Sequence, residues 1–229
     1  MVSVIYEDYA VLVVHKPGGT AVQTKRLGEK DMISLLKNYR AGKGEEPYIG
    51  VVHRLDQPVE GVMVFAKTPQ AAADLSRQFS HGQTEKYYHA LVYVKTPRDI
   101  ETGKEYTLTD YLVKDGKNNC SFVVEKSSPG AKKAVLTYRF LNQGKNLARV
   151  EVKLQTGRHH QIRVQFSHGG YPLVGDRKYG SKEAVESAEG NLVALCSVRI
   201  VFTHPVTLKK MEFTTIPENP IFEKALQRG

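Results

Sequence analysis

An aspartate stands at the entrance to a predicted buried strand. Asp56 ends the segment His53-Arg54-Leu55-Asp56, and Gly61 and the apolar run at 62–66 follow it. An ionised carboxylate in this place could act as a nucleophile or remove a proton. On this segment alone, however, an aspartate beside an arginine is more typical of an ordinary salt bridge or a turn. Other parts of the chain must decide between these interpretations.

Two further segments make catalysis the better interpretation of Asp56. Residues 86–90 read Lys-Tyr-Tyr-His-Ala, and residues 156–163 read Thr-Gly-Arg-His-His-Gln-Ile-Arg. With the Asp56 segment, they resemble the catalytic motifs of pseudouridine synthases and stand in the same order. The chain is therefore similar to the RluA-like pseudouridine synthases, the branch of that family that acts on ribosomal or transfer RNA.

The resemblance extends along almost the whole sequence. Residues 5–8 and 15–19 resemble the family's opening strand pair and its Lys-Pro-x-Gly loop, and residues 170–176 and 202–205 match its later landmarks. Many relatives carry an additional amino-terminal RNA-binding domain, whereas here the first catalytic strand is expected to begin at Val2. The resemblance thus implies that the catalytic domain and its loops hold the RNA.

Four positions depart from the family pattern. Val59 and Glu60 replace the Thr-Ser that commonly follows the aspartate motif, His159 stands where the third motif has Thr, and Gln165 stands where His is common. These departures leave the aspartate, tyrosine and arginine intact. Glu60 adds a second acid near the expected site and leaves the choice of substrate open.

The resemblance implies an α+β protein with the pseudouridine synthase fold, a mainly antiparallel bent sheet flanked by helices with a central cleft. It also implies isomerisation of uridine without a cofactor. The bond from ribose C1′ to uracil N1 breaks, the detached base turns, and a bond from C5 to C1′ replaces it. The nucleotide must first leave its stack, at a cost of a few kcal/mol.

Three catalytic residues follow from the resemblance. Asp56 is the essential carboxylate, which either adds to C1′ or removes a proton from C2′; the sequence does not separate these routes. Arg163 is expected to keep Asp56 ionised, and the alternative is an arginine that binds phosphate. Tyr88 is expected to stack on the uracil and to help remove the C5 proton, although an aromatic residue in a strand is usually part of the core.

Four more residues are assigned to substrate binding. Arg54 is expected to prop the opened RNA, with a surface ion pair as the alternative. Ile162 is expected to form an apolar wall beneath the uracil, with an ordinary helix-core role almost equally favoured. Lys86 is expected to act mainly through loop shape and electrostatics, like Lys16 and Pro17 in the opening loop. Arg158 is assigned to substrate binding as part of the third motif.

The positive charge is concentrated in one part of the chain. The 229 residues include 33 Lys and Arg against 24 Asp and Glu, a net charge of +9, and an excess of this kind attracts polyanions. Between Lys126 and Arg163 there are nine basic residues and one acid, Glu151. Such a run is either a solvated face or an RNA-binding surface, and the catalytic motifs beside it favour RNA.

The sequence predicts no metal, disulfide or membrane segment. Cys120 and Cys196 stand outside any metal-ligand spacing, and His53, His159, His160 and His168 have no clear carboxylate partner in the sequence. No leader and no apolar run of membrane-spanning length is visible. We therefore expect a cytoplasmic protein, with histidines that pack in the core or contact RNA.

The pattern along the chain predicts mostly strands. They are expected at 2–6, 11–15, 62–66, 87–94, 121–125, 134–141, 147–154, 192–202 and 210–216. Helices are expected after Asp31, from Thr68-Pro69 to Gly82, over 159–168 and after Asn219-Pro220. Residues 142–146 read as a hairpin turn. Residues 95–117 show no clear regular pattern and are expected to form loops that contact RNA.

Two functions from different classes remain open. The first is an RNA pseudouridine synthase, acting on large-subunit ribosomal RNA or, as the runner-up, on transfer RNA. The second is a binding module or RNA chaperone of the same fold without turnover. The 41% hydrophobic content and the length suit one sizeable core or two small lobes that share a sheet. One catalytic domain over residues 1–229 is the favoured prediction, and it is expected to be a monomer without an obligatory protein partner.

Overall fold

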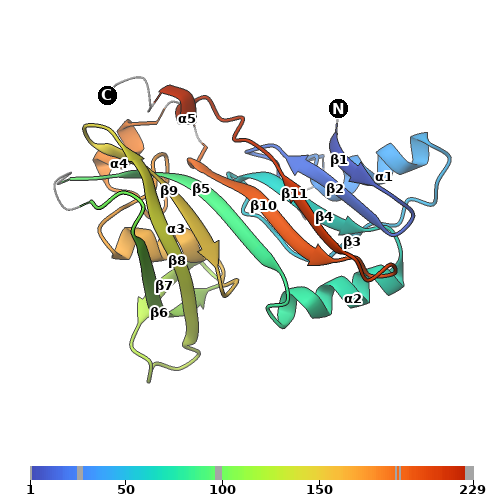
Figure 1. The fold of residues 1–229 in the computed structure, drawn as a ribbon, viewed down its shortest axis with the longest axis horizontal. Coiled ribbons are helices and arrows are strands. Elements are labelled where there is room, and N and C mark those ends of the chain that lie inside the picture. Colours follow the sequence, from blue (N-terminus) through green and yellow to red (C-terminus); the bar gives the residue numbers. More distant parts are fainter. Residues whose placement is uncertain (1, 25–27, 96–99, 189, 191, 225–229) are drawn as a thin grey trace. The chain divides into compact units, whose positions relative to one another are not determined.

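The computed structural model describes residues 2–24, 28–95, 100–188, 190 and 192–224 (Figure 1). The chain divides into two compact units, Met1–Lys86 with Cys196–Glu218 (unit 1) and Tyr87–Leu195 with Asn219–Gly229 (unit 2). Both units combine a mainly antiparallel sheet with few helices, which confirms the predicted α+β class. Among the described helices, none is long and apolar enough to cross a membrane.

The strands of unit 1 follow the order β1-β2-β4-β10, with β3 on β4 and β11 on β10. All of these pairs are antiparallel except β4 with β10, which run parallel. β2 and β4 are buried along their whole lengths, as expected for strands covered on both faces. The bounds are β1 (Ser3–Glu7), β2 (Val11–Lys16), β3 (Gly50–Val51), β4 (Glu60–Ala66), β10 (Leu195–Thr203) and β11 (Lys210–Thr214).

Two helices of unit 1 begin where the sequence predicts. Asp31 caps α1 (Met32–Gly42), and the Thr68 Oγ1 accepts a hydrogen bond from the Ala71 N–H at the start of α2 (Pro69–Ser80). Leu75 of α2 packs with β2 and β4 in one apolar cluster, and α2 lies along β3 and β4 (Figure 1). These contacts fix the strand that follows the Asp56 loop.

The strands of unit 2 form the antiparallel order β5-β9-β8-β6-β7. The hairpin predicted at 142–146 joins β8 to β9, where the Gly144 N–H donates to the Leu147 carbonyl (2.8 Å). The strands are β5 (Glu85–Tyr93), β6 (Glu105–Asp115), β7 (Cys120–Val124), β8 (Lys132–Gln143) and β9 (Leu147–Leu154). The helices are α3 (Gln161–His168), α4 (Lys182–Glu186) and α5 (Ile221–Lys224).

The prediction of loops over residues 95–117 was wrong for residues 105–115. Residues 96–99 lie outside the described residues, but β6 spans Glu105–Asp115 and pairs with both β7 and β8. Only Leu112 of this strand is fully buried, so the polar β6 sequence lacks a continuous apolar face. The short β3 and α4 were also not predicted.

Helix α3 begins two residues later than the sequence suggests. The predicted start, His159, precedes the helix, and His160 adopts the left-handed conformation (φ 54°) immediately before Gln161. A left-handed residue cannot be part of a right-handed helix. The first five residues of the third motif therefore form a loop that ends at the left-handed His160, and only its last three residues are helical.

Candidate active site

Asp56 lies in the loop between β3 and β4 of unit 1 and is partly exposed. Leu55 and Val59 on either side are buried, and the Val59 N–H donates to the Asp56 carbonyl (3.1 Å) in a turn. The loop backbone is thus anchored on both sides of Asp56. This arrangement leaves the carboxylate on the surface of a rigid support, which suits a reacting group.

Lys16 anchors the same loop from beneath. Its side chain is fully buried, and Nζ donates to the carbonyls of Pro17 (2.9 Å), Thr20 (2.7 Å) and Gln57 (3.2 Å). Burial lowers the pKa of Lys16 to about 8, although the negative charges of Asp56 and Glu60 oppose this shift. The ammonium therefore ties the Lys-Pro-Gly-Gly loop to the residue that follows Asp56, in line with its predicted role in loop shape.

Gly61 fixes the other end of the loop. Its φ of 121° is unfavourable for other residues, and a Cβ atom there would lie 2.3 Å from the Ser197 carbonyl oxygen. The β4 backbone therefore approaches β10 more closely than a side chain would permit. This contact explains why a glycine stands between Glu60 and the apolar run.

His53 is a neutral support for the Asp56 loop. Its Nε2 accepts a hydrogen bond from the Val64 N–H (3.1 Å), and its ring stacks on Phe79 at 4.4 Å. Burial, with a smaller contribution from the charge of Lys86, lowers the pKa of His53 to about 3. His53 therefore cannot carry a proton at neutral pH, which agrees with the predicted packing role.

Arg54 and Lys86 also belong to unit 1. Arg54 is exposed, and its Nη2 lies 3.4 Å from the Gln23 side-chain oxygen, a long contact that leaves the side chain at the surface. Lys86 is half-buried near the start of β5, and burial lowers its pKa. An exposed arginine and a partly desolvated lysine are both suited to contact an anionic ligand.

Tyr88 and Arg163 belong to unit 2. Tyr88 is buried in β5 and faces Val152 of β9. Arg163 is buried in α3 and forms a bidentate ion pair with Asp176, in which Nε donates to Oδ2 (2.7 Å) and Nη2 to Oδ1 (2.8 Å). Two of the five N–H donors of the guanidinium are thus directed to Asp176.

Sequence reasoning assigned no role to Asp176. Its carboxylate is fully buried and also accepts hydrogen bonds from the backbone N–H groups of Lys178 (3.0 Å) and Tyr179 (3.2 Å). Gly175 before it has a φ of 77°, and a Cβ atom there would lie 2.2 Å from the Leu192 carbonyl oxygen. The signal in the sequence was the Gly-Asp pair that ends the landmark at 170–176.

The third motif folds around a buried glutamine. The Gln161 side-chain oxygen accepts from Thr156 Oγ1 (2.8 Å) and from the Arg158 N–H (2.9 Å), and its amide donates to Gln165 (2.9 Å). Ile162 next to it is buried, as both interpretations of that residue require. Arg158 is exposed, with its Nε bonded to the Lys133 carbonyl (2.9 Å). The motif is therefore a preformed loop with an arginine at its surface.

Two of the four departures from the family pattern, His159 and Gln165, lie in this loop and in the helix that follows it. Gln165 is fully buried, and its amide donates to Asp110 (2.7 Å). The His159 ring stacks on His160 at 3.7 Å, and its Nδ1 lies 2.9 Å from the Ser121 hydroxyl. Hydrogen bonds thus satisfy the polar atoms that the substitutions introduce, as buried polar groups require.

Comparisons with known proteins show the family of this chain. The sequence profile described as RNA pseudouridylate synthase matches residues 10–168. Ribosomal large subunit pseudouridine synthase D of Zymomonas mobilis is 33% identical over 221 residues, which cover 92% of this chain and 67% of that protein. tRNA pseudouridine synthase C of Pectobacterium carotovorum is 31% identical, over 90% of this chain and 57% of that protein.

A solved structure gives the same result for the fold. Human RNA Pseudouridylate Synthase Domain Containing 4 superimposes with a TM-score of 0.76 at 22% identity, over 99% of this chain and 92% of that one. The α+β fold is thus that of pseudouridine synthase domains. With the profile match and the identity to curated relatives, the chain belongs to the RNA pseudouridylate synthase family.

The Arg163–Asp176 pair generates a stability prediction. Arg163→Met leaves a buried carboxylate without its guanidinium, so we expect a loss of about 3–5 kcal/mol in the free energy of unfolding. Asp176→Asn added to Arg163→Met removes the buried charge and should recover much of that loss. Urea unfolding of both variants measures the difference, with Arg158→Met as the exposed control. A double variant no more stable than Arg163→Met would contradict the charge explanation.

Proposed function

We propose that this chain isomerises particular uridines in structured RNA, most readily in large-subunit ribosomal RNA. The observation that carries the proposal is the Asp56 loop, held by the buried Lys16 ammonium at the mouth of β4. The name of the Zymomonas mobilis relative supports a ribosomal substrate, and that of the Pectobacterium carotovorum relative makes transfer RNA the alternative.

Asp56 is the group that reacts in this proposal. Its carboxylate adds to C1′ or removes the C2′ proton, and in either route the C1′–N1 bond breaks and its electrons pass to the uracil. The uracil turns and C5 bonds to C1′; in the first route the Asp56–C1′ bond breaks as this bond forms, and in the second route Asp56 returns the proton to C2′. The C5 proton then leaves and N1 takes up a proton. The net change moves the C1′ bond from N1 to C5 and a proton from C5 to N1, so the reaction needs no redox partner or energy donor.

The other site residues bind the substrate or support Asp56. Arg163 helps to keep Asp56 ionised through N–H donors beyond the two that it gives to Asp176. Tyr88 stacks on the uracil and assists the final proton transfer, and Ile162 forms an apolar wall for the base. The exposed side chain of Arg54 occupies the space that the flipped base vacates.

The basic segment of unit 2 supplies a phosphate-binding surface in this proposal. Six of its basic residues are exposed: Lys126, Lys132, Lys133, Arg139, Lys145 and Arg158. Arg158 bonds to the Lys133 carbonyl, so the third motif and the start of β8 present cations side by side. Lys145 follows the other end of β8. At the rise of an extended strand, that end lies roughly 35 Å from Lys132 and Lys133. Lys86 adds positive charge in unit 1.

A monomer acting in the cytoplasm completes the proposal. Cys120 and Cys196 form no disulfide, as a reducing compartment requires. The competing function is an RNA-binding module that keeps the fold without turnover. The partly exposed Asp56 on an anchored loop favours the enzyme, because RNA binding alone needs no carboxylate held in this way.

Asp56→Asn tests the proposed reaction. The substitution removes the carboxylate charge at nearly constant volume, so we expect RNA affinity within about threefold of the parent protein and loss of at least 1,000-fold in turnover, the order of effect seen when a catalytic group is removed. Tritium release from RNA labelled at uridine C5 measures turnover. Asp74→Asn on α2 serves as the control. Turnover by Asp56→Asn close to that of the parent would refute the site, and binding without tritium release by the parent would favour the binding module.

Lys132 and Lys133 test the RNA surface. Changing both to Gln should weaken binding to all RNAs alike, because ammonium groups sense phosphate charge and read little base identity. If both contact single-stranded RNA, the slope of log affinity against log salt should flatten by about 1.4, from about 0.7 per contact. Lys37→Gln on α1, an exposed lysine outside the basic segment, is the matched control and should leave the slope unchanged. An unaltered slope in the double variant would make this part of the segment a solvated face.

A further inference from the structure

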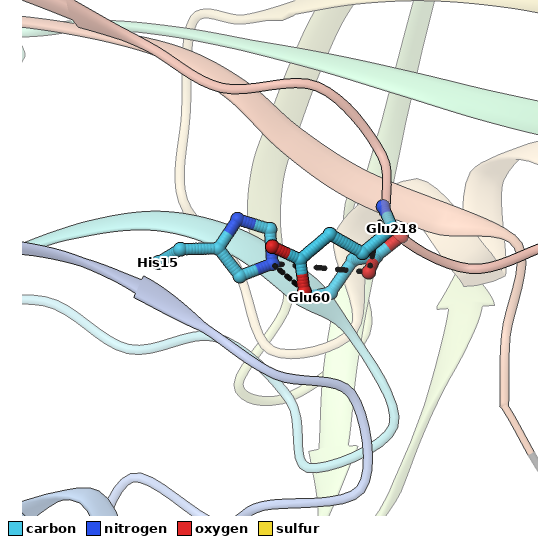
Figure 2. Close-up of side chains that lie close together, drawn as sticks. All are labelled: His15, Glu60 and Glu218. Atoms are coloured by element: carbon cyan, nitrogen blue, oxygen red, sulfur yellow. Dashed lines mark hydrogen bonds and ion pairs between the residues drawn. The ribbon is translucent and has the colours of Figure 1, made fainter. Parts of the chain in front are cut away.

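A histidine and two glutamates from separate segments of unit 1 converge on one point. His15 lies on β2, Glu60 begins β4, and Glu218 follows β11. One ligand atom from each residue lies within 4.8 Å of the other two, and Figure 2 shows the imidazole directed at the carboxylates. The motifs that define the proposed uridine chemistry do not explain this cluster.

The buried imidazole of His15 also indicates a ligand at this cluster. His15 is only 2% exposed, and its Nε2 is buried without a hydrogen-bond partner among the described residues. It lies 3.8 Å from Glu60 Oε2 and 3.6 Å from Glu218 Oε2, beyond hydrogen-bonding distance from both. A buried nitrogen in this position lacks the partner that such atoms normally have.

The second ring nitrogen defines what Nε2 can bind. His15 Nδ1 lies 2.9 Å from the Thr215 hydroxyl, which in turn donates to the Ile216 carbonyl (3.5 Å). When the hydroxyl donates its proton there, it accepts from Nδ1–H, and in that tautomer Nε2 presents a lone pair. Metal-binding histidines are commonly oriented by a hydrogen bond from their second nitrogen in this way.

The distances from His15 Nε2 to the two carboxylate oxygens suit a shared cation. Ligands about 2.0–2.1 Å from a tetrahedral zinc ion are separated by about 3.3 Å, within half an ångström of both distances from Nε2. Two carboxylates and a neutral imidazole carry a charge of −2, which a divalent ion neutralises. The combination of imidazole nitrogen and carboxylate oxygen favours zinc over magnesium or calcium.

We propose that His15, Glu60 and Glu218 form a binding site for one zinc ion. The Glu218 side chain is 60% exposed, so an ion can enter from solvent and keep a water molecule as its fourth ligand. The ion would join the segment after β11 to the strand that follows the Asp56 loop, and the Glu218 N–H already donates to Glu60 Oε2 (3.2 Å). Its role is structural, and it takes no part in the isomerisation.

Zinc alone is the probe for the first test. Protein treated with EDTA and then dialysed should bind one zinc ion per chain by isothermal titration, with a rise in unfolding temperature. His15→Gln, Glu60→Gln and Glu218→Gln should each weaken binding at least tenfold, and Thr215→Val should weaken it 10- to 100-fold. The controls His168→Gln and Glu212→Gln, which lie outside the cluster, should bind zinc like the parent.

Glu218→Cys keeps the test decisive if a buried variant fails to fold. A thiolate at this exposed position should retain metal binding and give a sulfur-to-cobalt charge-transfer band when Co²⁺ replaces zinc. Absence of that band, or less than one zinc ion per parent chain, would overturn the proposal and make the cluster an ion pair between protonated His15 and the glutamates. Equal zinc affinity in the parent and all three ligand variants would also overturn it.

Discussion

The three hydrogen bonds of the buried Lys16 ammonium are the interaction on which unit 1 depends for its site. A buried charge is costly unless hydrogen bonds compensate it, and here the carbonyls of Pro17, Thr20 and Gln57 do so. Because these carbonyls come from two loops, the same bonds join the loop after β2 to the loop that carries Asp56. The energetic requirement of one lysine thus sets the position of the proposed reacting group.

Unit 2 relies on the same principle with the charges reversed. Asp176 is a fully buried anion, and Arg163 and two backbone N–H groups compensate it. The pairing orients the guanidinium that the proposed mechanism assigns to Asp56. In each unit, a glycine with positive φ also permits a close backbone approach, of Gly61 to Ser197 and of Gly175 to Leu192. Both units therefore use buried charge to position a polar side chain.

Local patterns were sufficient to predict much of the fold. The capping signal at Thr68-Pro69, the apolar run of β4 and the turn between β8 and β9 each depend on neighbours in sequence. β6 was missed because its burial depends on the strands beside it. Family resemblance supplied the roles of Asp56, Tyr88 and Arg163, which stay predictions. Local sequence does not predict that Arg163 pairs with Asp176, because tertiary folding brings them together. The same holds for the cluster of His15, Glu60 and Glu218.

The central claim is that Lys16 holds Asp56 in its reacting position. Single-turnover tritium release by Lys16→Met tests it most directly, since methionine keeps the unbranched chain of lysine up to Cε, lacks Nζ and donates no hydrogen bond. With folding checked by circular dichroism and RNA at saturation, the account predicts a rate at least tenfold below that of the parent and unchanged affinity for RNA. The exposed Lys37→Met should release tritium at the parental rate. A folded Lys16→Met protein that turns over as fast as the parent would contradict the account.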